Sequence, residues 1–494
     1  MDPSVVLTLS FVALILTAGI FSTKLANYVG VPALVLFIGA GMILGTDGLD
    51  LVDFDDPVAA QLVATAALVV ILFEGGLQTR WSRLKPVAVP SGILATLGVI
   101  LTVIFTGLFA WKALRLDLPV AMLCAAIVGS TDAAAIFAVL RNREIRERLK
   151  ITVEAESGLN DPMALFLTQI FLTWVQTGHL SIGHSLLLMI WQLGMGLVIG
   201  LAMGRLVPWL LHRVRFDSGG LYPLLLLANA FITFAVASWI EASGIVAVYV
   251  FGIAINAADL PYRQSIVRFH DGLASLSQIV MFTLLGLLVR PTHMVPLIVP
   301  GLLVTLGLMF ISRPVAVLLC TLGMGYSRRE LLLLAWAGLK GAVPIILATF
   351  PLVAGVEESD VIFHLVFFVV LTSALVQGST ISPLAKWLGL VEAVAKPKPV
   401  SLELVAVEQC DTDLIEVEIT PGSDVQGKTL SELNLPPNVA ISAIVRQKQV
   451  VTPRGNTRLE PGDVVFVLAG KHYRERVLDF FTGEDSTSAT APAT

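Results

Sequence analysis

A series of long apolar stretches occupies residues 1–392 and constrains the fold more than any other feature of this sequence. Most of these stretches have about the 17 to 25 residues that an α-helix needs to cross the hydrocarbon core of a bilayer. Hydrophobic residues make up 56% of the 494 positions and charged residues only 14%, whereas about 25% of a typical soluble domain is charged. The sequence therefore predicts an all-α polytopic membrane protein embedded in the lipid bilayer.

Charged and turn-forming residues divide this region into thirteen candidate transmembrane helices. No basic segment precedes the first apolar stretch, so we expect it to be a retained helix rather than a cleaved signal. The candidate helices lie near residues 4–22, 31–46, 58–77, 87–111, 119–140, 151–177, 185–211, 220–240, 243–257, 266–290, 294–320, 328–353 and 360–390.

Basic residues in the connecting loops predict the orientation, because lysine and arginine concentrate on the cytoplasmic side. With the N-terminus outside, the acidic loops 47–56 and 357–360 fall outside, together with Lys112, Arg115 and Arg290. The other loop cations then lie inside: Lys24, Arg80, Arg83, Lys85, Arg141, Arg143, Arg146, Arg148, Lys150, Arg213, Arg215, Arg263, Arg268, Arg328 and Arg329. The sequence thus predicts a multi-pass protein of the cell membrane with a cytoplasmic C-terminus.

The composition changes after residue 392, where a proline- and lysine-containing linker is expected over 393–403. A small α+β cytoplasmic domain is predicted over 404–482, and a disordered tail over 483–494. Alternating or buried apolar patterns predict strands, and Gly-Pro-Asp combinations predict turns. The expected elements are strands at 414–419, 440–446 and 464–470, a short helix within 427–433, a turn at 459–463 and a final helix at 471–481.

Other classes of site find little support in the composition. The net charge is −5 and no basic stripe with interleaved aromatic residues occurs, so a nucleic-acid partner is excluded. Cys124, Cys320 and Cys410 are far apart in the sequence and indicate neither a disulfide framework nor a metal cluster. Apart from a transported cation, no metal is predicted.

Ionisable side chains at membrane depth are costly, so each is a functional candidate. The densest group lies in residues 154–162, at the start of an apolar helix. Ser157 and Asp161 are four residues apart and share one helix face, where they could present a hydroxyl and a carboxylate to one cation. Oxygen ligands suit Na⁺ and K⁺, and the absence of nearby histidine or cysteine argues against a transition metal.

Two further acidic residues have alternative interpretations. Glu156 points in a different direction from Asp161 and needs its own partner, for which Arg313 is the natural choice. Such a buried pair is more often structural than transporting. Glu74, near the inner end of its helix, is either a second cation ligand or a carboxylate that reaches toward the cytoplasm.

Two candidate helices contain glycine and polar residues at mid-membrane, at 129–132 and 338–341. This pattern predicts unwound helices whose broken ends expose carbonyl groups and dipole charge near the midplane. Asp132 suits a positive helix end and Lys340 a negative one. Tight packing of small residues is the alternative, but it explains the glycines without explaining two buried opposite charges.

Together, these residues resemble the monovalent cation/proton antiporters, in particular the NhaP-like branch related to the sodium/proton exchangers. The resemblance covers residues 1–392 and rests on motifs in the same order and at similar spacing. The motifs are LFEGGL (72–77), GSTDAAA (129–135), ESGLND (156–161), SRP (312–314) and GLKGAVP (338–344).

The resemblance implies an inverted-repeat fold with broken crossing helices, alternating access and a homodimer. It also implies that Asp161 carries either a proton or a cation, with Asn160 completing the family's Asn-Asp pair. The other implied roles are cation ligands at Ser157, Thr131 and Glu74, Asp132 acting through water, a structural pair of Glu156 with Arg313, and dipole neutralisation by Asp132 and Lys340. The family usually has arginine at the position of Lys340.

The C-terminal domain resembles the RCK-C (TrkA-C-like) regulatory module of potassium transport proteins, mainly through the segment LEPGDVVFVLAG (459–470). The glycine-rich dinucleotide fingerprint does not occur in the sequence, so we expect the usual NAD-binding half of such regulators to be absent. The ligand of the module is left open, with a cyclic dinucleotide or another nucleotide as candidates, and no other cofactor is expected. The resemblance to potassium-system regulators favours K⁺ over Na⁺ as the transported cation.

The predicted activity is an exchange of K⁺, and of Na⁺ as a second cation, for H⁺. Proton and cation compete for the same carboxylate, and Asn160 cannot titrate, so one ion per proton and electroneutral exchange are expected. A Na⁺(Li⁺)/H⁺ antiporter of the same mechanism is the main alternative. A cation channel gated by the RCK-C module would need a filter such as TVGYG, and an enzyme would need a motif such as H-E-x-x-H; the sequence has neither.

Overall fold

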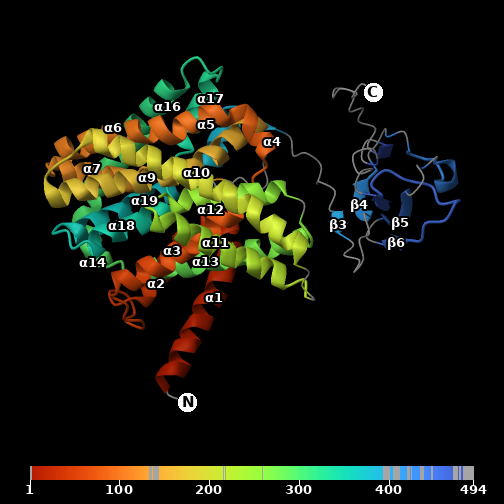
Figure 1. Cartoon of the computed structure of the whole chain (residues 1–494), viewed down its shortest axis with the longest axis horizontal. Helices are drawn as coiled ribbons and strands as arrows, with labels where there is room; N and C mark the ends of the chain where they lie inside the picture. Colours follow the sequence, from red (N-terminus) through yellow and green to blue (C-terminus); the bar gives the residue numbers. More distant parts are fainter. Residues whose placement is uncertain are drawn as a thin grey trace. The chain divides into compact units, whose positions relative to one another are not determined.

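The computed structural model describes residues 3–29, 31–132, 136, 144–214, 216, 218–258, 260–392, 401–403, 412–419, 423, 425–433, 435, 439–446, 449–470, 477 and 480–481. The chain divides into two compact units, Met1–Val394 and Ala395–Thr494. Figure 1 shows the first as a bundle of helices and the second as a small sheet. The prediction of an all-α membrane unit followed by a small strand-containing domain is therefore confirmed.

The helices of the first unit follow the apolar stretches of the sequence. From the N-terminus they are α1 (Pro3–Val29), α2 (Ala33–Leu44), α3 (Pro57–Gln78), α4 (Trp81–Leu84), η1 (Lys85–Val87), α5 (Ala88–Ile93), η2 (Leu94–Gly98), α6 (Val99–Leu114), α7 (Leu118–Ile127), α9 (Glu147–Thr177) and α10 (Ile182–Arg213). Then come α11 (Leu221–Trp239), α12 (Gly244–Ala257), α13 (Arg263–Leu287), α14 (Pro291–Met294), η3 (Val295–Leu297), α15 (Ile298–Gly307), η4 (Leu308–Ser312), α16 (Arg313–Thr321), α17 (Arg328–Trp336), α18 (Ala342–Val353) and α19 (Ser359–Trp387).

Local sequence signals set several helix ends. Asp56 caps α3, because its carboxylate accepts hydrogen bonds from the amides of Val58 and Ala59 at 3.0 Å, and proline follows at the first helical position. Ser327 and Glu330 form a reciprocal capping box at the start of α17. Gly178 ends α9 in the left-handed conformation at φ 71°, which glycine adopts at little cost.

Some helices approach one another closely through glycine. A Cβ atom on Gly76 of α3 would lie 2.5 Å from the carbonyl oxygen of Tyr249, and one on Gly252 of α12 would lie 2.6 Å from that of Phe73. These distances are shorter than any van der Waals contact, so α3 and α12 pack backbone to backbone at this point. The rings of Phe73 and Phe251 stack beside the contact with centroids 5.1 Å apart.

Six helices or continuous helical runs in the described residues are long and apolar enough to cross a membrane. Two of them, Trp81–Leu114 and Pro291–Thr321, are runs of several short elements. The other predicted spans correspond to shorter, less apolar or interrupted helices. The count of thirteen crossings stays a prediction.

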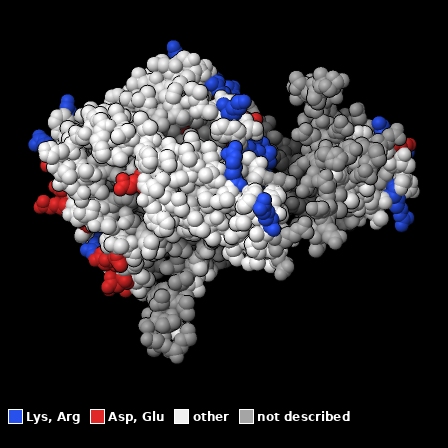
Figure 2. Space-filling model, in the orientation of Figure 1, with Lys and Arg blue, Asp and Glu red and all other residues white. Residues whose placement is uncertain are grey.

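Charged side chains are distributed unevenly over the first unit. On the face shown in Figure 2, acidic side chains gather toward the ends of α2 and α14, and basic side chains gather toward α4. A surface without charged side chains lies between them. This arrangement is typical of a protein whose middle zone contacts hydrocarbon.

Two helices are interrupted where the sequence predicts unwinding. The first, α7, ends at Ile127, and the chain is not helical at Ser130, Thr131 and Asp132. The second break separates the end of α17 at Trp336 from the start of α18 at Ala342. The amide of Asp132 donates to the carbonyl oxygen of Leu339 at 2.8 Å, so the two breaks lie against each other.

A short ribbon closes the first unit. The strands β1 (Glu144–Ile145) and β2 (Val391–Glu392) pair antiparallel, with Glu144 opposite Glu392 and Ile145 opposite Val391. The first strand directly precedes α9, and the second follows α19. The pairing therefore joins the start of α9 to the last described residues before the second unit.

The second unit is a five-stranded antiparallel sheet in the order β3-β4-β7-β5-β6. Its strands are β3 (Ser401–Glu403), β4 (Thr412–Glu418), β5 (Val439–Arg446), β6 (Gln449–Val451) and β7 (Val464–Gly470). The sheet therefore contains the three predicted strands and two short edge strands that were not expected. Apolar residues of the central strands form a core that includes Ile415, Val417, Ile444, Val465 and Val467.

Some boundaries of the second unit differ from the expectation. The predicted linker over 393–403 ends too late, because its last three residues pair with β4 as β3. The predicted helix within 427–433 is only a 3₁₀ turn, η5 (Leu430–Glu432), since glycine at 427 has a positive φ of 77° and belongs to the preceding turn. In the predicted final helix only residues 477, 480 and 481 are described, and the predicted tail lies outside the described residues.

Candidate functional site

Asp161 lies in a small cavity where the two helix breaks meet α9. Its side chain is buried, with 8% of the residue exposed, and it lines a cavity of about 60 Å³. The same cavity is lined by Leu68, Ile71, Leu72, Ser130, Thr131, Asp132, Ser157, Gly341, Ala342, Val343 and Pro344. Oxygen-bearing side chains therefore gather on one side of an otherwise apolar space.

The first break is fastened to α9 by side chains that surround Asp161. The hydroxyl of Ser157 donates to the carbonyl oxygen of Thr131 at 2.7 Å. The amide of Asn160 donates to the Thr131 hydroxyl at 2.6 Å, and its oxygen accepts from the Thr131 backbone N–H at 3.4 Å. Asn160 therefore holds the break in position and does not itself line the cavity.

Lys340 occupies the carbonyl end of the first broken helix. Its ammonium group donates to the carbonyl oxygens of Ser130 at 2.8 Å and Gly129 at 3.5 Å. The residue is only 1% exposed. A cation at a helix C-terminus is stabilised by the partial negative charge of the exposed carbonyls, so this geometry fits the contact expected for Lys340.

Asp132 lies against the start of the second broken helix. A Cβ atom on Gly341 would come 2.0 Å from Asp132 Oδ2, so only glycine leaves room for the carboxylate at this position. Gly341 directly precedes α18, whose N-terminus carries partial positive charge. The structure thus brings an acidic group to one broken end and a basic group to the other.

The second break is also held from α19. The amide of Gln377 donates to the carbonyl oxygen of Trp336 at 3.0 Å, and the backbone N–H of Lys340 donates to the Ser373 hydroxyl at 3.2 Å. Ser373 in turn donates to the Gln377 side-chain oxygen at 2.5 Å. These bonds satisfy backbone groups that the interruption of the helix leaves without helical partners.

Glu156 and Arg313 form a buried ion pair beside this assembly. Arg313 Nη2 lies 2.5 Å from Glu156 Oε1, and the two side chains are 4% and 2% exposed. The guanidinium also passes Gly338 of the second break, where a Cβ atom would lie 3.1 Å from Arg313 Nε. The pair therefore links α9 and α16 next to the broken helix.

Glu74 is the one predicted cation ligand that the structure does not bring to the cavity. It lies on α3, where its carboxylate accepts a hydrogen bond from Gln78 one turn later. It is not among the residues that line the space around Asp161. The role of Glu74 as a second cation ligand stays a prediction.

Sequence reasoning missed several residues that shape the site. Ser373 and Gln377 were passed over because they are uncharged, although two polar residues four positions apart in an apolar helix are a usable signal. Tyr249 was missed as well: a Cβ atom on Gly158 would lie 2.5 Å from its hydroxyl, so its ring packs against α9 next to Ser157. An aromatic residue in an apolar helix gives no such signal.

The arrangement can hold a small cation by charge and oxygen ligands. Carboxylate, hydroxyl and carbonyl oxygens are the groups that hard monovalent ions prefer. The two nearby basic side chains are engaged elsewhere, Lys340 with carbonyl oxygens and Arg313 with Glu156. Among the described residues, no ion pair includes Asp161.

Comparisons with known proteins identify the family of the chain. The family model described as sodium/hydrogen exchanger, transmembrane, matches residues 11–387, and the TrkA-C domain matches residues 414–482. The chain is similar to the K(+)/H(+) antiporter NhaP2 of Shewanella baltica (strain OS223), with 35% identity covering 95% of this chain and 82% of the relative. It is also similar to the K(+)/H(+) antiporter NhaP of Alkalimonas amylolytica, with 36% identity covering 94% and 81%.

A solved structure shares the fold of the membrane unit. The sodium proton antiporter MjNhaP1 from Methanocaldococcus jannaschii at pH 8 superposes with a TM-score of 0.69 at 26% identity, covering 78% of this chain and 99% of that one. These relatives are transporters, so the prediction of a transporter rather than an enzyme is confirmed. The chain therefore belongs to the sodium/hydrogen exchanger family of membrane cation/proton antiporters and carries a TrkA-C domain behind its membrane unit.

Proposed function

We propose that this protein exchanges K⁺ for H⁺ by alternating access, with Asp161 as the group that binds either ion. The observation that carries the proposal is that Asp161 is buried, lines a cavity and has no basic partner among the described residues. A buried carboxylate without an oppositely charged partner is unfavourable when ionised. It becomes neutral by taking up a proton or a monovalent cation, and the two therefore compete.

The residues around Asp161 have supporting roles in this proposal. The Ser157 hydroxyl and the oxygens of Thr131 are the nearest candidates to complete the cation shell, since both residues line the same cavity. Asp132 acts from the edge of the cavity through water. Lys340 and Asp132 compensate the exposed ends of the broken helices, and the pair of Glu156 with Arg313 holds the bundle together.

One residue pair sets the proposed stoichiometry. Asn160 precedes Asp161 and cannot titrate, so a single carboxylate alternates between one proton and one monovalent cation. The cycle then moves no net charge across the membrane. We expect an imposed membrane potential to leave the exchange rate in proteoliposomes nearly unchanged, and a steep voltage dependence would contradict this stoichiometry.

The central test replaces the carboxylate with its neutral isostere. Asp161→Asn should abolish cation-dependent proton flux in proteoliposomes, because the side chain can no longer take up a proton or balance the charge of a cation. The matched control is Asp117→Asn, the same change at an exposed residue before α7, which should retain wild-type flux. Exchange by Asp161→Asn at several pH values would remove Asp161 from the central role.

Potassium is proposed as the main ion because the relatives that match most of the chain are called K(+)/H(+) antiporters and because a TrkA-C domain follows the membrane unit. Another relative, from Methanocaldococcus jannaschii, is called Na(+)/H(+) antiporter 1, so Na⁺ is the second candidate. Proton release on addition of K⁺, Na⁺ or Li⁺, measured over a pH series, distinguishes them. A response to Na⁺ and Li⁺ alone would overturn the choice of potassium.

We propose that the protein is a homodimer in the cell membrane, with the N-terminus outside and the C-terminal domain in the cytoplasm. The basic loops predicted for the inner side support this orientation. Single cysteines placed at Asp117 or at Arg328 would test this orientation. When intact cells are treated with a membrane-impermeant thiol reagent, only the cysteine at position 117 should react. The mass of the detergent-solubilised protein would test the dimer.

The TrkA-C domain is proposed to regulate transport, with a nucleotide or cyclic dinucleotide as its candidate ligand. Deletion of the residues after 400 should change the dependence of exchange on pH or cation concentration. Unchanged transport together with weaker dimers would instead support a role in assembly alone.

A further inference from the structure

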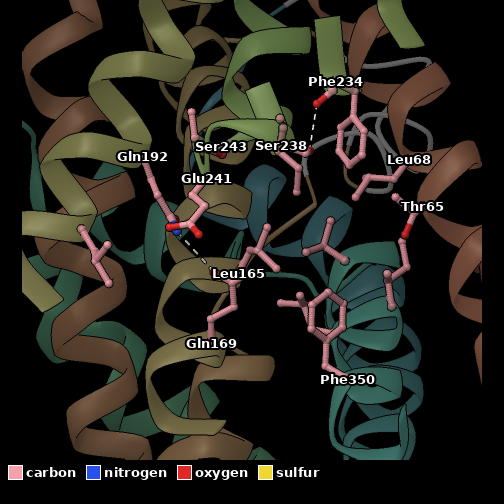
Figure 3. Close-up of a pocket in the computed structure, with 17 residues that line it drawn as sticks. Thr65, Leu68, Leu165, Gln169, Gln192, Phe234, Ser238, Glu241, Ser243 and Phe350 are labelled. Atoms are coloured by element: carbon pink, nitrogen blue, oxygen red, sulfur yellow. Dashed lines mark hydrogen bonds between the residues drawn. The ribbon is translucent and has the colours of Figure 1, made fainter. Parts of the chain in front are cut away.

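A second, larger cavity lies beside the one that contains Asp161. It has a volume of about 440 Å³ and is lined by residues of α3, α9, α10, α11, α12 and α18. Figure 3 shows its side chains, with Glu241, Gln192 and Gln169 on one side and mostly apolar residues on the other. Leu68 and Val343 line both this cavity and that of Asp161, so the two spaces share a wall.

The larger cavity lies along α9, beyond the position of Asp161. Asp161, Leu165 and Gln169 follow at intervals of four residues and occupy one face of the helix, with each step covering about 6 Å along its axis. Leu165 and Gln169 line the larger cavity. The cavity therefore lies toward the C-terminal end of α9, away from the end where β1 pairs with β2.

Six of the lining residues have polar side chains, and the three longest of them, Gln169, Gln192 and Glu241, lie on one side. The Gln192 amide donates to the Gln169 side-chain oxygen at 3.5 Å, and the Glu241 carboxylate lies on the same side of the cavity (Figure 3). No ion pair of the described residues includes Glu241. Glu241 and Gln169 are exposed, and Gln192 is half-buried. The unbalanced negative charge and the amide oxygens therefore lie on the solvent-accessible side of the cavity, opposite mostly apolar residues.

The turn that presents Glu241 is well fixed. Glu241 has a positive φ of 59°, a conformation that costs a non-glycine residue roughly 1–2 kcal/mol. The turn is tied to α10 by two hydrogen bonds: the indole N–H of Trp191 donates to the carbonyl oxygen of Ile240 at 3.0 Å, and the Ser243 amide donates to that of Gln192 at 3.1 Å. The surrounding structure therefore maintains the direction of the Glu241 side chain.

We propose that Glu241, Gln169 and Gln192 form a second cation site, an entry station that concentrates the monovalent cation before it reaches Asp161. The proposal rests on the exchange function proposed for Asp161. A carboxylate in a cleft with low-dielectric walls raises the local concentration of cations. The amide oxygens replace part of the ion's hydration shell. The shared wall at Leu68 and Val343 separates the entry station from the cavity that contains Asp161.

This role predicts an effect on one side of the membrane only. In Glu241→Gln, the KM for cation supplied from the side of the α11–α12 turn should rise by about tenfold, the low end of electrostatic focusing. The KM from the opposite side and the maximal rate should stay at wild-type values. Glu241→Asp keeps the charge and should recover most of the affinity. The cation alone, K⁺ or Na⁺, serves as the probe in vesicles of known orientation.

The matched control removes an acidic residue on the same side of the membrane but outside the cavity. Glu357 is exposed and follows α18. The C-terminal half of α18 lines the cavity through Phe350, but Glu357 does not. The variant Glu357→Gln should therefore leave the KM for the cation unchanged on both sides. A second readout uses ionic strength, because the difference between wild type and Glu241→Gln should shrink as an inert salt screens the charge.

The outcomes separate this inference from the function on which it rests. Equal KM values for wild type and Glu241→Gln on both sides, with exchange intact and dependent on Asp161, would overturn the entry station alone. A KM raised equally on both sides would indicate a general structural effect and would also overturn it. Absence of cation-dependent proton flux in the wild type would instead contradict the proposed exchange.

Discussion

Glu156 and Asp161 lie five residues apart on α9, and both are nearly excluded from solvent, yet their surroundings are opposite. Glu156 lies 2.5 Å from a guanidinium group. Asp161 faces a cavity and forms no ion pair within the described residues. Burial alone therefore does not indicate function. A buried carboxylate that is paired with a basic side chain stabilises the bundle, whereas an unpaired one that faces a cavity is available to an ion.

The basic residues of the site show the same division. Arg313 compensates a side-chain charge, whereas Lys340 compensates the carbonyl end of α7 through Ser130 and Gly129. Because Lys340 is held by the backbone, it adds positive charge near Asp161 without closing an ion pair with it. A fixed cation nearby disfavours a second cation and favours its release, which fits the alternating role proposed for Asp161.

The largest effect is expected when the carboxylate facing the cavity is neutralised. Asp161→Asn should reduce exchange to the background of empty liposomes while the thermal unfolding temperature stays equal to or above that of the wild type, because a buried group without a charged partner gains by becoming neutral. Flux and unfolding are measured on the same purified sample. Unfolding at a much lower temperature would mean that Asp161 is a structural residue like Glu156.

The reverse result is expected for the paired carboxylate. Glu156→Gln leaves Arg313 buried without a counter-charge, which should lower the free energy of unfolding by about 3–5 kcal/mol. The double variant Glu156→Gln with Arg313→Met should recover much of that loss, and it should exchange ions more actively than the single variant. Thermal unfolding in detergent measures the stability of the single and the double variant, and cation-dependent proton flux in proteoliposomes measures their exchange. Wild-type stability of the single variant would contradict a structural role for the pair.

An intermediate effect is expected where the two breaks touch. Gly341→Ala places a methyl group 2.0 Å from the Asp132 carboxylate, and relieving the overlap should cost about 1–3 kcal/mol and lower the exchange rate. The matched control is Gly272→Ala on α13, where a Cβ atom meets nothing within 4 Å, and which should be neutral or slightly stabilising. Equal behaviour of the two variants would show that the breaks tolerate displacement.

The smallest effect is expected for an ion pair outside the membrane. Arg446 donates to Asp463 through Nε and Nη2 at 2.8 Å. Burial opposes ionisation of Asp463, but hydrogen bonds from Arg446 and from the Glu460 backbone outweigh it and hold the pKa of this carboxyl below its ordinary value. The stabilisation is therefore present above the unfolded-state pKa, about 4, and is lost as the pH falls through the lowered folded-state pKa.

Hydrogen exchange of β7 in the full-length protein checks this last prediction. Wild-type amides should lose protection on acidification, whereas Asp463→Asn should show reduced protection already at neutral pH and a weaker pH dependence. Transport should stay near wild type, in contrast to the effect of breaking the buried pair. An unchanged pH dependence of protection in Asp463→Asn would contradict a stabilising role for this carboxylate.

Much of the fold could be predicted because membrane helices leave a strong one-dimensional signal. Apolar length located the helices, and glycine beside Asp132 and Lys340 predicted both breaks, since such residues are costly in a continuous apolar helix. The strands β3 and β6 could not be predicted because three-residue edge strands have almost no pattern of their own. Register and pairing in that sheet depend on contacts distant in the sequence.

The site itself was only partly predictable. Spacing on α9 grouped Ser157 with Asp161 and separated them from Glu156. The contact of Lys340 with the carbonyl groups of Ser130 could not be derived, because nothing in the sequence says which break faces which. The position of Glu74 apart from the cavity also depends on how α3 is rotated in the bundle, which its sequence leaves open.

The ribbon of β1 and β2 connects the start of α9 directly to the end of the helical bundle. Two residue pairs join residues 144–145, just before α9, to residues 391–392, just after α19, so they connect the two ends of the stretch that contains Asp161 and the last helix of the bundle. While the ribbon is intact, the start of α9 cannot slide or turn without moving the point at which the polypeptide leaves the bundle. A displacement of that exit point is therefore transmitted directly to α9, the helix that contains Asp161, without first passing through the other helices.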